Sequence, residues 1–449
     1  MRRILPKNLI TLANACPKPL YLVGGSVRDY LSSHTLIKPD WDICSPMHAD
    51  EFVEIAQRIG FHVQAVYQNT GTVKLRDNDG NDYEYSCFRS DKYVRGVHTP
   101  VEIFFTDDIE KDARRRDFTA NAVYFDIAAD QIVDPLDGVT AIQEKRLTTV
   151  APAKKVFSED GLRLLRLARQ AAQLGFTPDK ACLQGAKENA ALIDDISPER
   201  IYTELSLLLS ADKKYGVAYG QYHGLKILDK TGVLARIFPE LTLGKNMLQR
   251  PDFHNHDVLE HSLRAVKYAD ESIRLAALLH DVGKPRCMLD DGNAHAHPNV
   301  GKELAIRVLS RLKAPKRVIQ TTAQLVALHM YDFNCQTSEN KLRKFFVEHY
   351  EILPQLLLLK QADFSACKDD VSPAPTCVKW NALLAKLQNE RAPLTLKQLA
   401  INGKDLLEIG IPPQKVAYVL HDLLLRAATA PTINEKATLC KIALRELNV

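Results

Sequence analysis

The stretch "YLVGGSVRDY", Tyr21–Tyr30, and the "DWD" that follows it at Asp40–Asp42 decide the fold expected for the amino-terminal part. An apolar run ends at Gly24 and Gly25, which predicts a strand entering a tight turn whose bare backbone can approach a phosphate. The helix N-terminus of the next turn and Arg28 would both favour an anion. These residues predict a phosphate cradle, although a lone Gly-Gly would be an ordinary turn between strand and helix.

Asp40 and Asp42 lie one residue apart in a segment expected to be a strand, where aspartate is disfavoured. Residues i and i+2 of a strand point to the same face, so both carboxylates project together while Trp41 points toward the core. Two parallel carboxylates repel each other unless a cation joins them, and oxygen ligands suit Mg²⁺. We expect a catalytic magnesium site on Asp40 and Asp42, against the alternative of two incidental acids in a solvated loop.

The composition is that of an ordinary globular protein: 449 residues, 46% hydrophobic and 25% charged, with a net charge of +4. This length predicts two to four domains, and any basic surface must be local, as at "DARRRD", Asp112–Asp117. Nine cysteines without a C-x-x-C pair favour a reducing compartment and argue against a disulfide framework. No stretch approaches the roughly 20 apolar residues of a membrane span, so we expect a cytoplasmic protein that contacts no membrane.

Two kinds of sequence divide the chain. Short β-type runs and turns extend to about Val150, whereas helical periods dominate from Ser158 onward. We therefore expect an α+β head, with a mixed sheet and helices, followed by an all-helical body. The segment "EDGLRLLRLARQAAQLGF" is predicted to be one helix that begins after an N-cap at Ser158 and ends at Gly175.

Asp160 and Arg163 are three residues apart in that segment, so on one helix they would be neighbours, with Arg166 and Arg169 extending the stripe. The ordinary alternative is a salt-bridged surface helix. A carboxylate beside a guanidinium, however, complements the amine donor and ring-nitrogen acceptor of cytosine and adenine, and uracil and guanine present the opposite order. The pair predicts selection of C and A without a template, because a hydrogen-bonding site rejects partners that leave its groups unpaired.

Histidines and aspartates of the body recur in a definite order. His261 is followed by the adjacent pair His280 and Asp281, and then by His297, His329 and Asp363. Scattered histidines on helices are usually structural, but histidine and carboxylate ligands from successive helices suit a divalent transition metal.

"YLVGGSVRD", "DWD" and "DARRRDFTANA" together resemble the class II tRNA nucleotidyltransferases, which are the CCA-adding enzymes and their relatives in the DNA polymerase beta-like nucleotidyltransferase superfamily. The resemblance covers essentially the whole chain. It implies template-independent addition or repair of the 3′-terminal CCA of tRNA from CTP and ATP, with tRNA and both nucleotides as partners. It also implies that Glu159 to Arg163 correspond to the E-D-x-x-R motif of the family.

Within "RRRDFTANA" the resemblance implies that Arg116 and Asp117 contact the triphosphate and ribose of the incoming nucleotide. Asn121 falls one helical turn after Asp117 and could share its face. Arg114 or Arg115 is expected to be solvated. A third carboxylate often joins the pair in that superfamily, and Glu84 in "DYEYSCF" is the candidate.

The order of histidines and aspartates resembles the HD phosphohydrolases, in which the aspartate of the HD pair can bridge two metals. This implies Ni²⁺, Mn²⁺ or another divalent metal in the body and an additional metal-dependent phosphohydrolase activity. The segment "LAINGKDLLEIGIPPQKVAYVLHDLLLRA" reads as two amphipathic helices around "GIPP" and resembles the tail of the family, which helps to hold the tRNA. The expected division is a head over 1–150, a neck over 151–250 with nucleobase-reading and RNA-binding helices, an HD domain over 251–370 and a tRNA-binding tail over 371–449.

The candidate residues fall into three groups. The catalytic and magnesium-binding pair is Asp40 and Asp42; the nucleotide-binding residues are Gly25, Arg28, Arg116, Asp117, Asp160, Arg163, Arg166 and Arg169; the HD metal ligands are His261, His280, Asp281, His297, His329 and Asp363. A CC-adding enzyme, an A-adding enzyme and a bacterial poly(A) polymerase share all these motifs and remain alternatives, with a monomer or homodimer expected. An HD-domain phosphohydrolase or regulator whose head only binds nucleotide, and a non-catalytic RNA-binding protein, are alternatives of other classes.

Overall fold

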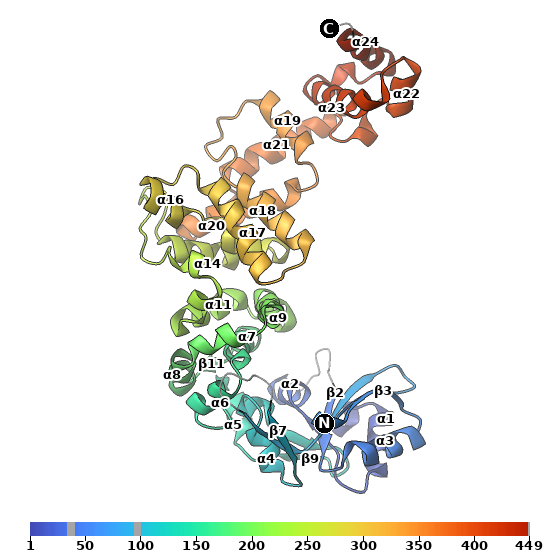
Figure 1. The fold of residues 1–449 in the computed structure, drawn as a ribbon, viewed down its shortest axis with the longest axis vertical. Coiled ribbons are helices and arrows are strands. Elements are labelled where there is room, and N and C mark those ends of the chain that lie inside the picture. Colours follow the sequence, from blue (N-terminus) through green and yellow to red (C-terminus); the bar gives the residue numbers. More distant parts are fainter. Residues whose placement is uncertain (34–40, 94–99, 448–449) are drawn as a thin grey trace. The chain divides into compact units, whose positions relative to one another are not determined.

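A computed structural model describes residues 1–33, 41–93 and 100–447, so Asp40 lies outside the described residues. The chain divides into two compact units, Met1–Pro239 and Glu240–Val449 (Figure 1). Among the described helices, none combines the length and the apolar character needed to cross a membrane.

The first unit is built on a seven-stranded mixed sheet in the order β3-β4-β5-β2-β1-β8-β9, in which only the β2–β5 pair among the described strands is parallel. The strands are β1 (Tyr21–Val23), β2 (Trp41–Ser45), β3 (His62–Tyr67), β4 (Thr72–Arg76), β5 (Asp82–Cys87), β8 (Tyr124–Asp126) and β9 (Gln131–Val133). A separate ribbon pairs β6 (Arg89–Lys92) with β7 (Glu102–Phe105). The expected α+β head with a mixed sheet is confirmed.

The predicted strand, turn and helix around the two glycines are present. β1 ends at Val23 and is followed by Gly24, which has a left-handed φ of +79°; α2 (Gly25–Ser33) begins at the next residue. Only glycine adopts this backbone conformation without steric cost. Trp41 in β2 is 7% exposed and stacks on Tyr83, so it points into the core as predicted.

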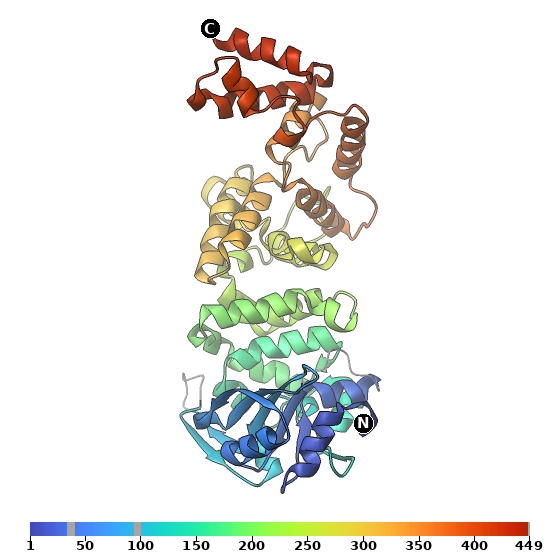
Figure 2. The same cartoon turned by 90° about the vertical axis from the view of Figure 1, so that its right-hand side faces the viewer.

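The remaining helices of the first unit cover the sheet and then pack on one another (Figure 2). They are α1 (Lys7–Ala15), α3 (Ala49–Arg58), α4 (Ile109–Arg114), α5 (Gly138–Gln143), α6 (Ala153–Glu159), α7 (Leu162–Leu174), α8 (Lys180–Glu188), α9 (Pro198–Leu209), α10 (Ala211–Tyr215), α11 (Gly220–Thr231) and α12 (Val233–Ile237). Two short parallel strands, β10 (Arg146–Leu147) and β11 (Thr177–Pro178), pair the segment before α6 with the segment after α7.

The single helix predicted after Ser158 is wrong at its beginning. Asp160 has an extended backbone between α6 and α7, and its Oδ1 accepts a hydrogen bond from the Leu162 amide at 3.0 Å, so Asp160 caps α7. A Cβ on Gly161 would lie 2.5 Å from the Leu192 carbonyl oxygen, so this close approach requires glycine. α7 ends at Gly175 with φ of +66°, as predicted.

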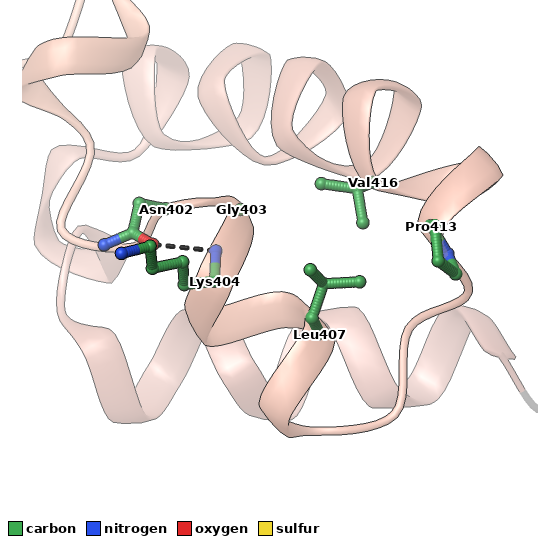
Figure 3. Close-up of a pocket in the computed structure, with 6 residues that line it drawn as sticks. All are labelled: Asn402, Gly403, Lys404, Leu407, Pro413 and Val416. Atoms are coloured by element: carbon green, nitrogen blue, oxygen red, sulfur yellow. Dashed lines mark hydrogen bonds between the residues drawn. The ribbon is translucent and has the colours of Figure 1, made fainter.

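The second unit is entirely helical among the residues that the structure describes. Its helices are α14 (Val258–Tyr268), α15 (Arg274–Leu279), α16 (Lys284–Asp291), α17 (His297–Arg311), α18 (Lys316–Leu328), α19 (Glu339–Glu348), α20 (Leu353–Lys368), α21 (Pro375–Asn389), α22 (Gly403–Glu408), α23 (Pro413–Thr429) and α24 (Lys436–Leu447), with α13 (Pro239–Thr242) at the boundary of the two units. The helices predicted around "GIPP" correspond to α22 and α23, which line an open groove of about 580 Å³ between Asn402 and Val416 (Figure 3).

Candidate active site and metal centre

A cavity of about 460 Å³ in the first unit contains Asp42 and all eight predicted nucleotide-binding residues. Nine basic and four acidic side chains line it, which is a charge balance suited to a polyphosphate. The lining residues are Gly24, Gly25, Arg28, Asp42, Arg89, Asp91, Tyr93, Arg115, Arg116, Asp117, Asn121, Asp160, Leu162, Arg163, Arg166, Arg169, Gln170, Gln173, Leu174, Arg200 and Lys214.

The turn after β1 lies against the carboxylate of β2. A Cβ on Gly24 would be 3.4 Å from Oδ2 of Asp42, so the glycine backbone and the carboxylate meet at the cavity wall. This half-buried carboxylate fits Mg²⁺, which prefers oxygen ligands. Glu84 is the register partner of Asp42 on β5, but its exposed carboxylate lies 3.7 Å from Nζ of Lys74 and does not line the cavity.

Arg28 joins three elements beneath the cavity. Its guanidinium donates to Oδ1 of Asp29 at 2.7 Å, to Oδ1 of Asn121 at 2.6 Å and to the hydroxyl of Tyr215 at 3.1 Å. The Tyr215 hydroxyl in turn donates to Oδ2 of Asp29 at 2.7 Å. Because these partners engage its donors and Asp29 offsets its charge, Arg28 serves chiefly to hold α2 against α10 at the cavity wall.

Asp112, which the sequence did not single out, anchors the arginine run. Its buried carboxylate accepts from Arg115 at 2.7 Å, from Arg116 at 2.9 Å and from the Tyr124 hydroxyl at 2.7 Å. Burial alone would raise the pKa of Asp112, but the guanidinium groups of Arg116 and Arg115 hold it well below its usual range. The spacing of three and four residues after Asp112 was the available signal.

The three consecutive arginines have different surroundings. Arg114 is about half exposed and pairs with Glu110, as expected for a solvated side chain. Arg115 and Arg116 are each 15% exposed and line the cavity. The expectation that Arg114 or Arg115 is solvated is met by Arg114, whereas Arg115 belongs to the cavity.

Asp117 and Asn121 lie side by side, although no helix spans them: Phe118 is extended and a 3-10 turn covers Thr119–Asn121. Oδ1 of Asp117 accepts from Nδ2 of Asn121 at 2.9 Å, and its Oδ2 accepts from Nε of Arg166 at 2.8 Å. Burial opposes ionisation of Asp117, but the Arg166 guanidinium lowers its pKa well below the usual range. The ion pair therefore joins the arginine run to α7.

Asp160 and Arg163 both reach the cavity, although they do not form the predicted helical stripe because the helix is broken between them. Oδ2 of Asp160 lies 3.7 Å from Nη2 of Arg200. Arg163 is 6% exposed and donates to the carbonyl oxygens of Val156 at 3.0 Å and Arg115 at 2.7 Å. Arg169 also lines the cavity, where its Nε donates to Glu204 at 2.6 Å.

Several lining residues could not be selected from the sequence. They are Arg89, Asp91, Tyr93, Gln170, Gln173, Arg200 and Lys214, which come from β6, the residue after it, and α7, α9 and α10. Gln170 and Gln173 lie in the quoted helical segment but were not selected as site residues, and the other five lie outside every quoted motif, so only the folded chain brings them to the cavity.

The six predicted HD ligands converge in the second unit. His261, His280 and Asp363 form one group whose ligand atoms lie within 4.8 Å of one another, and Asp281, His297 and His329 form a second. Nε2 of His261 lies 3.1 Å from Nε2 of His280 and 3.0 Å from Oδ1 of Asp363. In the second group, Nε2 of His297 lies 3.1 Å from Nε2 of His329.

The hydrogen bonds of the histidines test whether this centre suits a metal. Nδ1 of His280, His297 and His329 lies 2.8, 2.6 and 2.7 Å from a backbone carbonyl oxygen, so each Nδ1 carries the proton and donates. Each Nε2 then presents a lone pair. The facing Nε2 atoms of His297 and His329 would repel each other unless a cation lies between them, so the residues fit a divalent metal.

Asp281 connects the two groups. Its carboxylate is 1% exposed; Oδ1 lies 3.3 Å from Nε2 of His297, and Oδ2 lies 3.3 Å from Nε2 of His280. Nζ of Lys284 is the cation nearest to it in the described chain, at 2.7 Å from Oδ2. A carboxylate that directs one oxygen at each group has the arrangement needed to bridge two metal ions.

Comparison with known proteins identifies the parts of the chain. Residues 20–148 match the poly A polymerase head domain, residues 175–243 the probable RNA and SrmB-binding site of polymerase A, and residues 258–363 the HD domain. An A-adding tRNA nucleotidyltransferase of Deinococcus radiodurans is 30% identical over 435 residues, covering 91% of each chain. A CCA-adding enzyme of Streptococcus mutans is 38% identical over 194 residues, which are 42% of this chain and 46% of that enzyme.

Solved structures share the fold. The CCA-adding enzyme of Bacillus stearothermophilus in complex with CTP matches with a TM-score of 0.66 at 24% identity, covering 99% of this chain and 98% of that one. The Thermotoga maritima CCA-adding enzyme complexed with tRNA matches with a TM-score of 0.62 at 18% identity, covering 99% and 97%. With the family matches along the sequence, the conclusion is that this chain belongs to the class II CCA-adding and tRNA nucleotidyltransferase family, with a poly(A) polymerase-type head, an RNA-binding segment and an HD domain.

Proposed function

We propose that this chain adds or repairs the complete 3′-terminal CCA of tRNA from CTP and ATP and releases pyrophosphate. The observation that carries the proposal is the cavity in which Asp42, a basic wall and the Asp160–Arg163 pair meet. A nucleotide needs a phosphate site, a carboxylate near the reacting phosphorus and a base-reading edge, and this cavity offers candidates for each.

In the proposed reaction the 3′-hydroxyl of the tRNA attacks the α-phosphate; the new oxygen–phosphorus bond forms as the bond to pyrophosphate breaks. Arg115 and Arg116 are held by Asp112, so their charges are positioned for the phosphates before substrate binds. Mg²⁺ held by Asp42 and Asp40 would supply activation of the hydroxyl and neutralisation of the leaving group.

Base choice is assigned to Asp160 and Arg163. Asp160→Ala combined with Arg163→Ala is expected to raise incorporation of UTP and GTP relative to CTP and ATP, with a loss of roughly 1–3 kcal/mol of discrimination. The measurement is the ratio of kcat/KM values for the four nucleotides. The ratio is the appropriate readout because Arg163 also holds two backbone carbonyls, so the absolute rate will fall for structural reasons.

Arg114→Ala serves as the matched control, since Arg114 is an arginine of the same unit whose partner Glu110 lies on the surface. It should leave the ratio unchanged. An equal loss of rate on all four nucleotides in the double variant would mean that the pair positions α7 and reads no base.

Narrower activities remain as alternatives, and the A-adding relative from Deinococcus radiodurans supports one of them. The decisive experiment presents tRNAs ending before CCA, after C and after CC to the full chain, with each labelled nucleotide separately. Products are resolved to one nucleotide. Addition of C, C and A in turn supports the proposal; addition of A alone, of C alone, or of a long A tract indicates an A-adding enzyme, a CC-adding enzyme or a poly(A) polymerase.

A second activity is favoured by the complete ligand set of the HD domain. We propose that this domain, loaded with Ni²⁺, Mn²⁺ or another divalent ion, hydrolyses phosphoesters such as 2′,3′-cyclic nucleotides, 2′-nucleotides or RNA ends carrying a cyclic phosphate. Damaged tRNA ends would need this cleaning before CCA repair. We retain the division into residues 1–150, 151–250, 251–370 and 371–449 as part of the proposal, with the last segment assigned to tRNA binding.

A further inference from the structure

Three hydrogen bonds, all in the plane of the guanidinium group, hold the side chain of Arg163. Nη1 donates to the Val156 carbonyl at 3.0 Å and to Oε2 of Glu159 at 2.9 Å, and Nη2 donates to the Arg115 carbonyl at 2.7 Å. These bonds leave the Nε–H and one Nη2 hydrogen without a partner in residues 1–33, 41–93 and 100–447. Because each of these bonds tolerates a departure of about 30° from linearity, they anchor the guanidinium but leave its plane some freedom to tilt.

Tyr93 covers a face of this guanidinium. Cζ of Arg163 lies 5.6 Å from the centroid of the Tyr93 ring, within the range of a cation–π contact. The Arg163 side chain is only 7% exposed, so little water competes with the ring. The hydroxyl of Tyr93 donates to Oδ2 of Asp91 at 3.4 Å, a weak bond that leaves the ring face as the principal contact.

Tyr93, Asp160 and Arg163 all line the same cavity. The tilt of the Arg163 plane decides where its remaining donors point, and a donor that reads a ring nitrogen must lie close to the plane of the base. The ring of Tyr93, packed over the guanidinium, limits the tilt that remains.

We propose that Tyr93 is a positioning residue that sets base choice by fixing the tilt of Arg163. This inference rests on the proposed function, because it assumes that Arg163 reads the base. Tyr93 itself does not contact the base and acts only through Arg163.

The test uses the full chain and three substitutions of Tyr93. Tyr93→Phe keeps the ring face and should hold the CTP-to-UTP ratio within about twofold. Tyr93→Leu and Tyr93→Met remove the face and should lower the ratio between about 2-fold and 30-fold, the range that a cation–π contact supports. The ratio is measured twice, as kcat/KM for incorporation and as equilibrium affinity of each nucleotide in the absence of tRNA.

Two controls separate positioning from general packing. Tyr67→Leu removes a tyrosine that is 51% exposed and lies outside the cavity lining, and should leave both ratios unchanged. In an Arg163→Met background, Tyr93→Leu should cause no further change, because the guanidinium through which it acts is gone.

Equal weakening of all four nucleotides in Tyr93→Leu, or a Tyr93→Phe variant that behaves like Tyr93→Leu, would overturn the inference. A wild-type chain that binds CTP and UTP equally would overturn it together with base reading by Arg163. A wild-type chain that prefers CTP in binding but adds nothing to tRNA would refute the proposed transfer reaction alone, and the binding ratios of the variants would still decide the role of Tyr93.

Discussion

Asp42→Ala is expected to abolish nucleotide addition. The fall in kcat/KM should be at least about a thousandfold, which corresponds to a loss of about 4 kcal/mol of transition-state stabilisation. The physical reason is the loss of a carboxylate that lies at the cavity wall beneath the turn at Gly24, where it can hold Mg²⁺ at the reacting phosphate. Binding of tRNA should remain largely intact, as measured by an electrophoretic mobility shift assay. Asp40→Ala is expected to give the same result.

Asp107→Ala is the matched control, because this aspartate is exposed and pairs only with Lys18 among the described residues. It should retain wild-type turnover. Glu84→Ala tests the candidate third carboxylate: a fall comparable to that of Asp42→Ala assigns it to the metal, and a small effect leaves it as the surface partner of Lys74. Normal turnover of Asp42→Ala would end the assignment of this residue as a metal ligand.

His280→Ala combined with Asp281→Ala is expected to eliminate phosphoester hydrolysis and metal binding by the HD domain while CCA addition continues. The removed groups belong to both ligand sets, since Asp281 directs one oxygen to His297 and the other to His280. Elemental analysis should find divalent metal in the wild type and none in this variant. Hydrolysis of the cyclic and 2′-phosphate substrates is measured with Ni²⁺ and with Mn²⁺.

Asp281→Asn is the control for unfolding of the double variant, because it keeps the volume of the buried side chain and removes only its charge. Metal at a hundredfold excess over its Kd should stabilise the wild type by about 2.7 kcal/mol, measured as a rise in Tm, and should not stabilise this variant. His295→Ala, which removes an exposed histidine two residues before His297, should behave as the wild type. If the wild type contains no metal and hydrolyses none of these substrates, the HD domain has only a structural role.

Features that depend on local patterns were predictable. The alternation of a strand put Trp41 into the core and left Asp42 on the opposite face, and the turn at Gly24 followed from two glycines after an apolar run. The six candidate HD ligands could be selected from their order and from the resemblance to HD phosphohydrolases, although the sequence could not show that Asp281 lies between the two groups.

Features that depend on distant neighbours were not predictable. The break before α7 lies at Asp160, whose backbone is extended, and the next residue, Gly161, packs against the carbonyl of Leu192, thirty-one positions later, whose location no periodicity reveals. In the same way, Tyr93 meets Arg163 only after β6 and α7 have folded against a common cavity. The geometry that we propose for base reading is therefore a tertiary property, even where its residues form a recognisable motif.

The hydrogen bonds of Arg28 have a consequence for the cooperativity of the first unit. A single guanidinium engages Asp29 in α2, Asn121 after the arginine run and Tyr215 at the end of α10, segments separated by up to 187 positions. Any local opening that separates the glycine turn from α10 must break the two bonds that the Tyr215 hydroxyl makes with Arg28 and Asp29, which are the partners of a buried ion pair. The turn and the helical layer that closes over it therefore belong to one unfolding unit, so the cavity floor has the stability of the core and not that of a surface loop.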